Sequence, residues 1–259
     1  MLEILYCNQN NIISALAESL VVGGLPMETK KITSEGLNKE IPDLEEILGT
    51  IWHNKEYFIF DKKNKVIRFK EDLDEDILYC LFEEQKEGIK RMNEMCKSID
   101  KYTKRGRTLG HVKAGSGHNS MFKGVGFNMI IKFPLYWLKE YQRYNFTDII
   151  SSQSTMHKIL EFNLSEMFSN EVDPRCIVVI EELRNEYNNE TDIDKKKKIW
   201  RKLINSCPDG LHMVMGITMN YLQAASIIEQ RKHHKLSEWS NDLVPYLQSL
   251  PFYDFFMGE

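Results

Sequence analysis

Residues 124–145 read GVGFNMIIKFPLYWLKEYQRYN and predict a strand followed by a helix. The part from Gly126 to Phe133 is apolar and contains β-branched residues, which is typical of a buried strand. Pro134 has no backbone N–H and is expected to end that strand. Helical spacing then predicts a buried helix face formed by Trp137, Leu138 and Tyr141. This helix is expected to end near Asn145.

Upstream of this unit, the sequence predicts a mixture of elements. The apolar run Ala15–Val22 is expected to be a strand or a short helix that ends in a turn. Residues 51–69 predict a β-hairpin, and residues 74–104 predict a helix. Six of the 14 glycines lie within residues 106–126. This density of glycines predicts a loop whose backbone makes a close contact, because glycine has no side chain to prevent it.

Downstream, the pattern is mainly helical. Two helices are expected at residues 174–190 and 193–206, and residues 236–250 predict a shorter one. Residues 211–233 form the longest uninterrupted helical pattern. The lysines at 195–198 are interpreted as a solvated helix face rather than a nucleic-acid patch. Because strands come first and helices later, the order indicates an α+β fold.

Composition limits the classes of function. The chain has 259 residues, of which 42% are apolar, so it can bury a sizeable core. A net charge of −4 predicts no overall electrostatic attraction to nucleic acid. The five cysteines are odd in number and far apart, which argues against a disulfide framework or a paired-cysteine zinc site. With no signal peptide and no apolar run of about 20 residues, a soluble cytosolic protein is expected.

Three polar segments are candidates for a site. The loop Gly115–Ser120 can present backbone N–H groups to phosphate, although such a loop alone is more often a turn. A helix beginning near Met215 would align one largely polar face at positions i, i+3, i+7, i+11, i+14 and i+18. Those positions are Asn220, Gln223, Ile227, Arg231, His234 and Glu238. This face either lines a site for an anionic heteroaromatic ligand or is solvated. The third segment, residues 141–157, is either a site or ordinary helix capping.

These segments, in this order, resemble the flavin-dependent thymidylate synthases. In that family a His-x-Ser/Thr-Pro-Phe-Glu-His segment precedes a strand, a helix and an Arg-His-Arg motif. Here His118–Gly124 begins the match and Arg143–Asn145 ends it without a gap. The next family segment is similar to Ser151–His157 if one insertion is allowed. After Pro208, the helix motif of the family matches at Asn220, Gln223, Ser226 and Arg231, and with one deletion at His234 and Glu238.

The resemblance covers about residues 115–240 and is nearest to a phage-encoded branch. It implies a single domain over residues 1–259, with residues 1–110 divergent and residues 111–259 family-like. The implied fold has a central antiparallel or mixed sheet and a long helical C-terminal half. The implied reaction transfers a one-carbon unit from methylenetetrahydrofolate to C5 of deoxyuridylate, with FAD as cofactor and NADPH as reductant. A homotetramer in the cytoplasm of a bacterial or phage-infected cell is implied.

The resemblance also assigns roles to residues. Arg231 is implied to be catalytic, because a fixed charge can stabilise anionic character on the pyrimidine ring. The residues implied to bind the flavin are His118, Ser120, Arg143, Tyr144, Asn145, Asn220, Ser226 and His234. Those implied to bind the pyrimidine nucleotide are Glu140, Ser152, Ser154 and Arg231. No metal is expected. The family works without an enzymic nucleophile, and the sequence shows no nucleophile motif.

The chain departs from the family pattern at several of these positions. The family's Arg-His-Arg is Arg143-Tyr144-Asn145 here, and the glutamine three residues before it is Glu140. Met156 and Ile204 replace two phosphate-binding arginines, for which Lys158, Arg201 or Lys202 could substitute. Two alternatives therefore stay open. One is a related enzyme that makes hydroxymethyl-dUMP or acts on dCMP, and the other is a non-catalytic nucleotide-binding protein.

Overall fold

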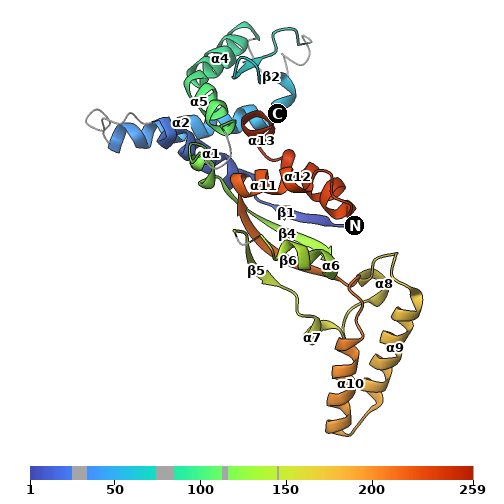
Figure 1. The fold of residues 1–259 in the computed structure, drawn as a ribbon. Coiled ribbons are helices and arrows are strands. Elements are labelled where there is room, and N and C mark those ends of the chain that lie inside the picture. Colours follow the sequence, from blue (N-terminus) through green and yellow to red (C-terminus); the bar gives the residue numbers. More distant parts are fainter. Residues whose placement is uncertain (25–33, 74–84, 113–115, 145, 259) are drawn as a thin grey trace. The chain divides into compact units, whose positions relative to one another are not determined.

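The computed structural model describes residues 1–24, 34–73, 85–112, 116–144 and 146–258 (Figure 1). The described chain is α+β, and it divides into two compact units. The first, called the sheet unit below, comprises Met1–Cys7, Asn128–Met219 and Arg231–Val244. The second, called the helical unit, comprises Asn8–Phe127, Asn220–Gln230 and Pro245–Glu259.

A four-stranded sheet with the strand order β1-β4-β6-β5 organises the sheet unit (Figure 1). The strands are β1 (Glu3–Cys7), β4 (Gly126–Pro134), β5 (Asp148–Ser152) and β6 (His212–Asn220). The pairs β1–β4 and β5–β6 are antiparallel. Every second residue of β4 and β6 is buried, as a strand with a two-residue period requires. Strand β4 confirms the prediction for 126–133, whereas β1 was not predicted.

Strand β6 corrects the prediction of one long helix over 211–233. Residues His212–Asn220 are extended, and the helix α11 (Tyr221–Arg231) begins only after them. In the run HMVMGITMN, apolar residues recur both at helical spacings and at alternate positions. Hydrophobic periodicity alone therefore could not distinguish a helix from a strand here. The side chains of Asn220 and Gln223 then cap α11 reciprocally, each accepting the other's backbone N–H at 3.1 and 2.7 Å.

The predicted polar face from Asn220 to Glu238 is therefore not one face of one helix. Asn220 ends a strand, and Glu238 begins a separate π-helical segment, η4 (Glu238–Leu243). The shorter predicted helix at 236–250 corresponds to η4 together with α12 (Val244–Gln248). Only the part from Gln223 to Arg231 shares a helix.

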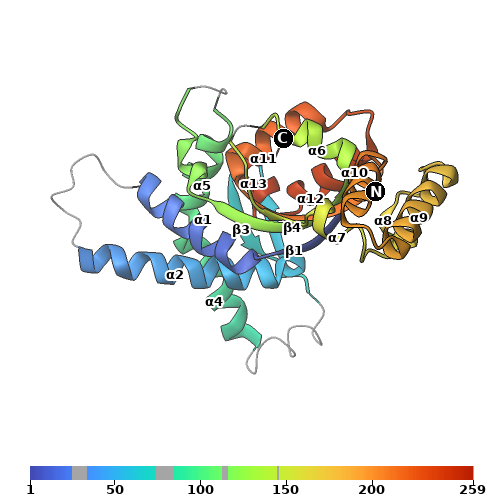
Figure 2. The ribbon, with the colours of Figure 1, turned by 90° about the horizontal axis from the view of Figure 1, so that it is seen from below.

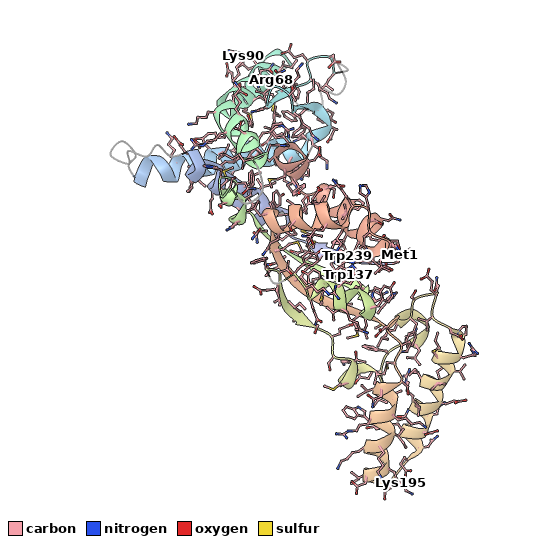
Figure 3. The ribbon with its side chains drawn as sticks, in the orientation of Figure 1. Met1, Arg68, Lys90, Trp137, Lys195 and Trp239 are labelled. Atoms are coloured by element: carbon pink, nitrogen blue, oxygen red, sulfur yellow. The ribbon has the colours of Figure 1, made fainter. Side chains whose placement is uncertain are left out.

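Three further helices of the sheet unit agree closely with prediction. Helix α6 (Leu135–Tyr141) follows β4 and buries Trp137 and Tyr141, although it ends before Asn145, which lies outside the described residues. The antiparallel pair α9 (Pro174–Asn189) and α10 (Ile193–Asn205) lies side by side (Figure 1). Lys195 of the predicted solvated face is exposed near the start of α10 (Figure 3). Two short helices, α7 (Thr155–Lys158) and α8 (Leu164–Met167), precede this pair.

The helical unit packs helices around a small hairpin. Helix α1 (Gln9–Gly24) lies along α2 (Ser34–His53), as Figure 2 shows. The remaining elements are η2 (Lys55–Tyr57), β2 (Phe58–Asp61), β3 (Val66–Phe69), α4 (Gln85–Ser98), α5 (Asp100–Gly110), η3 (Ser120–Lys123) and α13 (Tyr253–Met257). The predicted hairpin is confirmed for β2 and β3, whereas residues 51–53 end α2.

Two predictions in this unit need correction. The predicted helix 74–104 is described only from residue 85, where it forms α4 and α5 with a break at Ile99. The glycine-rich segment is not one loop, because Gly106 and Gly110 belong to α5. The expected close approach is real there, since a Cβ on Gly106 would lie 2.7 Å from the ring of Phe256 in α13. Gly115 lies outside the described residues, and Gly117 has a φ of 77°.

No described helix is long and apolar enough to cross a membrane. Among the described cysteines, Cys96, Cys176 and Cys207 are free thiols.

Candidate functional site

A cluster of polar side chains surrounds Arg231 at the end of α11. Arg231 Nε donates to the hydroxyl of Tyr144 at 2.7 Å, and Nη1 donates to Glu140 Oε2 at 3.1 Å. The same carboxylate oxygen accepts the indole N–H of Trp239 at 2.9 Å and lies 3.4 Å from His234 Nε2. We call Glu140, Tyr144, Arg231, His234 and Trp239 the Arg231 cluster. All five belong to the sheet unit.

Aromatic rings pack against the Arg231 cluster. The guanidinium of Arg231 lies 4.6 Å from the ring centroid of Trp239 and 5.5 Å from that of Tyr144. Trp239 in turn packs on Trp137, with 4.6 Å between ring centroids (Figure 3). Both indoles are fully buried. Cation–π contacts of this kind and a carboxylate partner offset the cost of holding the Arg231 side chain at 15% exposure.

The cluster unites four of the residues that the resemblance assigned to flavin or nucleotide. Glu140 and Tyr144 come from α6 and the turn after it, while Arg231 and His234 come from the end of α11 and beyond. The two contacts of Arg231 join residues that are 87 and 91 positions apart in the sequence. A local pattern could not have predicted that convergence.

Other assigned residues of the sheet unit stand apart from these hydrogen bonds. The Arg143 side chain is exposed and forms no ion pair with the described residues. Ser152 is exposed at the end of β5, and Ser154 precedes α7 as its half-buried N-cap residue. Of the proposed substitutes for the missing arginines, Lys158 is paired with Glu161 at 2.6 Å.

The remaining assigned residues belong to the helical unit. His118 and Ser120 are exposed around the turn into η3. Asn220 caps α11, and the hydroxyl of Ser226 accepts a hydrogen bond from Gln230 at 3.0 Å. The side chains of Asn220 and Ser226 therefore each have a hydrogen-bond partner within the protein. Asn145 is outside the described residues.

Trp239 is the member of the Arg231 cluster that sequence reasoning did not assign. The match with the family's helix motif ended one residue earlier, at Glu238. Its role depends on the turn between α11 and η4, which brings the indole back under Arg231. No group of three or more potential metal ligands occurs in the part of the chain that the structure describes.

No protein-family model matches the chain, and no curated protein is similar to it in sequence. One solved structure, thymidylate synthase X (ThyX) from Helicobacter pylori with FAD and dUMP, is 17% identical, with a TM-score of 0.47. That match covers 60% of this chain and 82% of that chain. Another structure of ThyX from Helicobacter pylori, complexed with FAD and dUMP, is 12% identical with a TM-score of 0.46, and covers 100% of this chain and 97% of that chain. At these values neither likeness assigns a function.

Proposed function

We propose that this chain is a flavin-dependent enzyme that transfers a one-carbon unit from methylenetetrahydrofolate to C5 of deoxyuridylate. The fold would be thymidylate synthase-like, with residues 111–259 as its family-like part. The observation that carries the proposal is the Arg231 cluster. Four side chains that the resemblance assigned to flavin or nucleotide, from distant segments, gather around one guanidinium.

Arg231 is the residue proposed to stabilise negative charge that develops on the pyrimidine ring. A guanidinium has five N–H groups, and among the described residues Tyr144 and Glu140 accept from two of them, which leaves three for a ligand. Tyr144 and Glu140 fix the plane of the guanidinium, and the indole of Trp239 keeps water from one of its faces. A positioned, partly dehydrated cation stabilises an anion more strongly than one in bulk water.

The residues present also suit a diphosphate-bearing cofactor. Arg143 carries a fixed charge on an exposed side chain, two residues from the end of α6. Arginine binds phosphate through its planar fork of donors. FAD, reduced by NADPH, would supply the redox chemistry and carry the one-carbon unit. The protein would supply orientation, through Arg143 and Tyr144, and the charge of Arg231.

An assembly of several copies is part of the proposal. Strand β5 is an edge of the sheet, and all five of its residues are exposed. Ile149 and Ile150 on this edge are 40% and 58% exposed, and the nearby Phe146 is 80% exposed. Apolar side chains along an unpaired edge favour association with another chain. Ser152 lies on the same edge, so a second copy there would complete the site, as the implied homotetramer requires.

Titration of the purified protein with FAD tests the cofactor. We expect saturable binding, seen as a shift of the visible flavin spectrum and a change of flavin fluorescence. Arg143→Ala is expected to weaken binding by about tenfold, the loss of a charge-assisted contact of roughly 1.4 kcal/mol. Arg175→Ala, which removes an exposed arginine at the start of α9, is the matched control and should leave binding unchanged. A protein that binds no FAD at any concentration contradicts the proposal.

Glu140 favours a second candidate, an enzyme that acts on a cytosine nucleotide. All three contacts of its carboxylate go to Oε2, and Oε1 meets no donor within the described residues. An ionised carboxylate only accepts hydrogen bonds, whereas the glutamine of the family can also donate. The amino group of cytosine is a donor that carboxylates recognise, and the corresponding oxygen of uracil is not.

The two candidates differ in nucleotide preference. If Oε1 of Glu140 contacts the base, calorimetry should show tighter binding of dCMP than of dUMP, and Glu140→Gln should reverse the order. We expect each preference to be on the order of tenfold, the scale of one discriminating hydrogen bond. If dUMP binds more tightly than dCMP to both the wild type and Glu140→Gln, Glu140 does not determine the base preference, and the first candidate is retained. If neither nucleotide binds, both candidates fail, and the remaining alternative is a protein that has kept the fold without this activity.

A further inference from the structure

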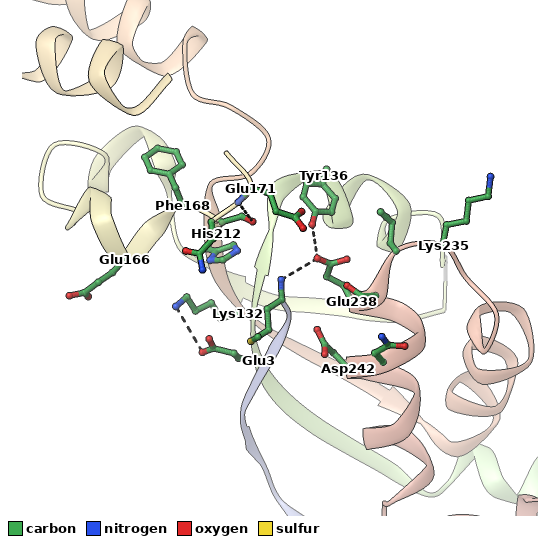
Figure 4. Close-up of a pocket in the computed structure, with 16 residues that line it drawn as sticks. Glu3, Lys132, Tyr136, Glu166, Phe168, Glu171, His212, Lys235, Glu238 and Asp242 are labelled. Atoms are coloured by element: carbon green, nitrogen blue, oxygen red, sulfur yellow. Dashed lines mark hydrogen bonds and ion pairs between the residues drawn. The ribbon is translucent and has the colours of Figure 1, made fainter. Parts of the chain in front are cut away.

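A separate pocket lies wholly within the sheet unit, between β1, the segment 166–171 at the end of α8, and η4 (Figure 4). Its volume is about 690 Å³, which is within the range of small-molecule sites. No residue of the Arg231 cluster lines it. Of its lining residues, Glu238 belongs to the match with the family's helix motif, but the resemblance assigned no flavin-binding or nucleotide-binding role to Glu238.

Carboxylates outnumber cationic groups in the lining of this pocket. Three carboxylates, those of Glu171, Glu238 and Asp242, lie around the hydroxyl of Tyr136. Glu238 accepts that hydroxyl at 2.6 Å and is only 4% exposed. Burial and then the charges of Glu238, Glu171 and Asp242 raise the pKa of Tyr136, so the phenol stays neutral and continues to donate.

The three carboxylates differ in whether they have interaction partners within the protein. Glu238 also lies 3.2 Å from the Met1 amino group, and Asp242 accepts the backbone N–H of Leu2 at 2.7 Å. Glu171 is exposed, and its carboxylate has no partner among the residues that the structure describes. The lysines do not balance this excess: Lys132 lies 3.9 Å from Glu3, and Lys235 points away from the other lining side chains (Figure 4).

An unpartnered imidazole provides a second, independent indication of a ligand. His212, the first residue of β6, lines the pocket and is 9% exposed. Its Nε2 has no hydrogen-bond partner in the described part of the chain. A buried polar atom without a partner is costly, which makes a ligand or water at this position favourable. Burial, with Lys132 and the Met1 amino group, lowers the pKa of His212, so the ring is neutral and one of its nitrogens is an acceptor.

We propose that this pocket binds a small aliphatic diamine or polyamine. The exposed carboxylate of Glu171 accepts hydrogen bonds, and the buried Nε2 of His212 accepts one when the ring proton is on Nδ1, so a ligand that donates hydrogen bonds can satisfy both groups. The described residues hold no group of carboxylates and histidines arranged for one metal ion, which favours an extended cation over a point charge. Phe168 and Leu236 in the lining offer apolar surface to the methylene groups of such a ligand.

Isothermal titration calorimetry of the full chain with putrescine and with spermidine tests this inference. We expect saturable binding at one site per chain, weakened by added salt. The uncharged analogue 1,4-butanediol has the same chain length as putrescine and should bind at least about tenfold more weakly. Comparable binding of butanediol would overturn the assignment of a cationic ligand, and absence of saturable amine binding would overturn the site.

Matched variants locate the binding. Glu171→Gln removes the unpartnered charge and should weaken putrescine binding by about tenfold, and His212→Leu should also weaken it. Glu186→Gln removes an exposed charge from α9, outside the pocket, and should leave binding unchanged. Circular dichroism confirms that each variant is folded. Equal weakening by Glu171→Gln and Glu186→Gln, or no effect of Glu171→Gln, would contradict the proposal.

Discussion

The guanidinium of Arg231 is mostly buried and contacts several groups. A carboxylate, a phenol oxygen and two aromatic faces surround the guanidinium. Removing one partner of such a pair generally costs more than the pair contributes, because the other charge is left uncompensated. Glu140 is therefore tied to Arg231 in the free protein, and an anionic substrate would have to compete with it. That competition is the physical consequence of a glutamate at a position where the family has glutamine.

His212 predicts a specific dependence of stability on pH. Burial lowers the pKa of His212 in the folded state below the unfolded value of about 6.5. Below that pH the unfolded chain binds a proton more readily than the folded chain does. The free energy of unfolding therefore decreases as the pH falls. Urea unfolding of the wild type and His212→Leu at pH 7.5 and pH 5.5 measures this difference. The wild type should lose more stability than the variant on acidification, and an equal or smaller loss would show that burial does not disfavour the charged ring.

At the scale of elements, the fold was predictable where one period dominated a segment. Strand β4, helix α6 and the pair α9 and α10 follow from their own patterns, turn residues and caps, such as Asp192 at the start of α10. Strand β6 was not predictable in this way, because its methionines suit a helix as well as a strand. Its structure depends on pairing with β4 and β5, which is a tertiary contact.

Two glycines in helices predict opposite effects of the same substitution. Gly49 lies within α2, and a Cβ there would meet nothing within 4 Å. Gly49→Ala should therefore stabilise the protein by about 0.5–1 kcal/mol through helix propensity. At the end of α5, a Cβ on Gly110 would collide with the backbone carbonyl of Phe256. Gly110→Ala should destabilise by roughly 1–3 kcal/mol.

Chemical denaturation of these two variants beside the wild type gives both values. The signs are the test, since the substitutions have the same chemistry and differ in surroundings. If Gly110→Ala is as stable as the wild type, α5 and α13 are not in close contact. If Gly49→Ala is destabilising, the exposed side of α2 is covered by something that the helical unit does not contain.

At the scale of the whole molecule, the sequence singled out four of the five residues of the Arg231 cluster, but not their contacts. Motif order identified Glu140, Tyr144, Arg231 and His234, and the structure brings these four together. It did not predict their mutual pairing, because contacts over about 90 positions depend on the tertiary fold. The expected helix from Met215 would also have placed Asn220 on the face of Arg231, whereas Asn220 ends a strand. The flavin-binding, nucleotide-binding and catalytic roles of all the assigned residues stay predictions.

The most direct measurement of the central claim is the mass of the nucleotide product. The purified protein is incubated with FAD, NADPH, methylenetetrahydrofolate and dUMP or dCMP, and the product is analysed by mass spectrometry. We predict a nucleotide that has gained one carbon at C5, formed at a rate that Arg231→Ala reduces by about 10²–10³-fold and that Arg175→Ala leaves unchanged. Unaltered nucleotide in every incubation, or turnover that Arg231→Ala leaves intact, would contradict the account.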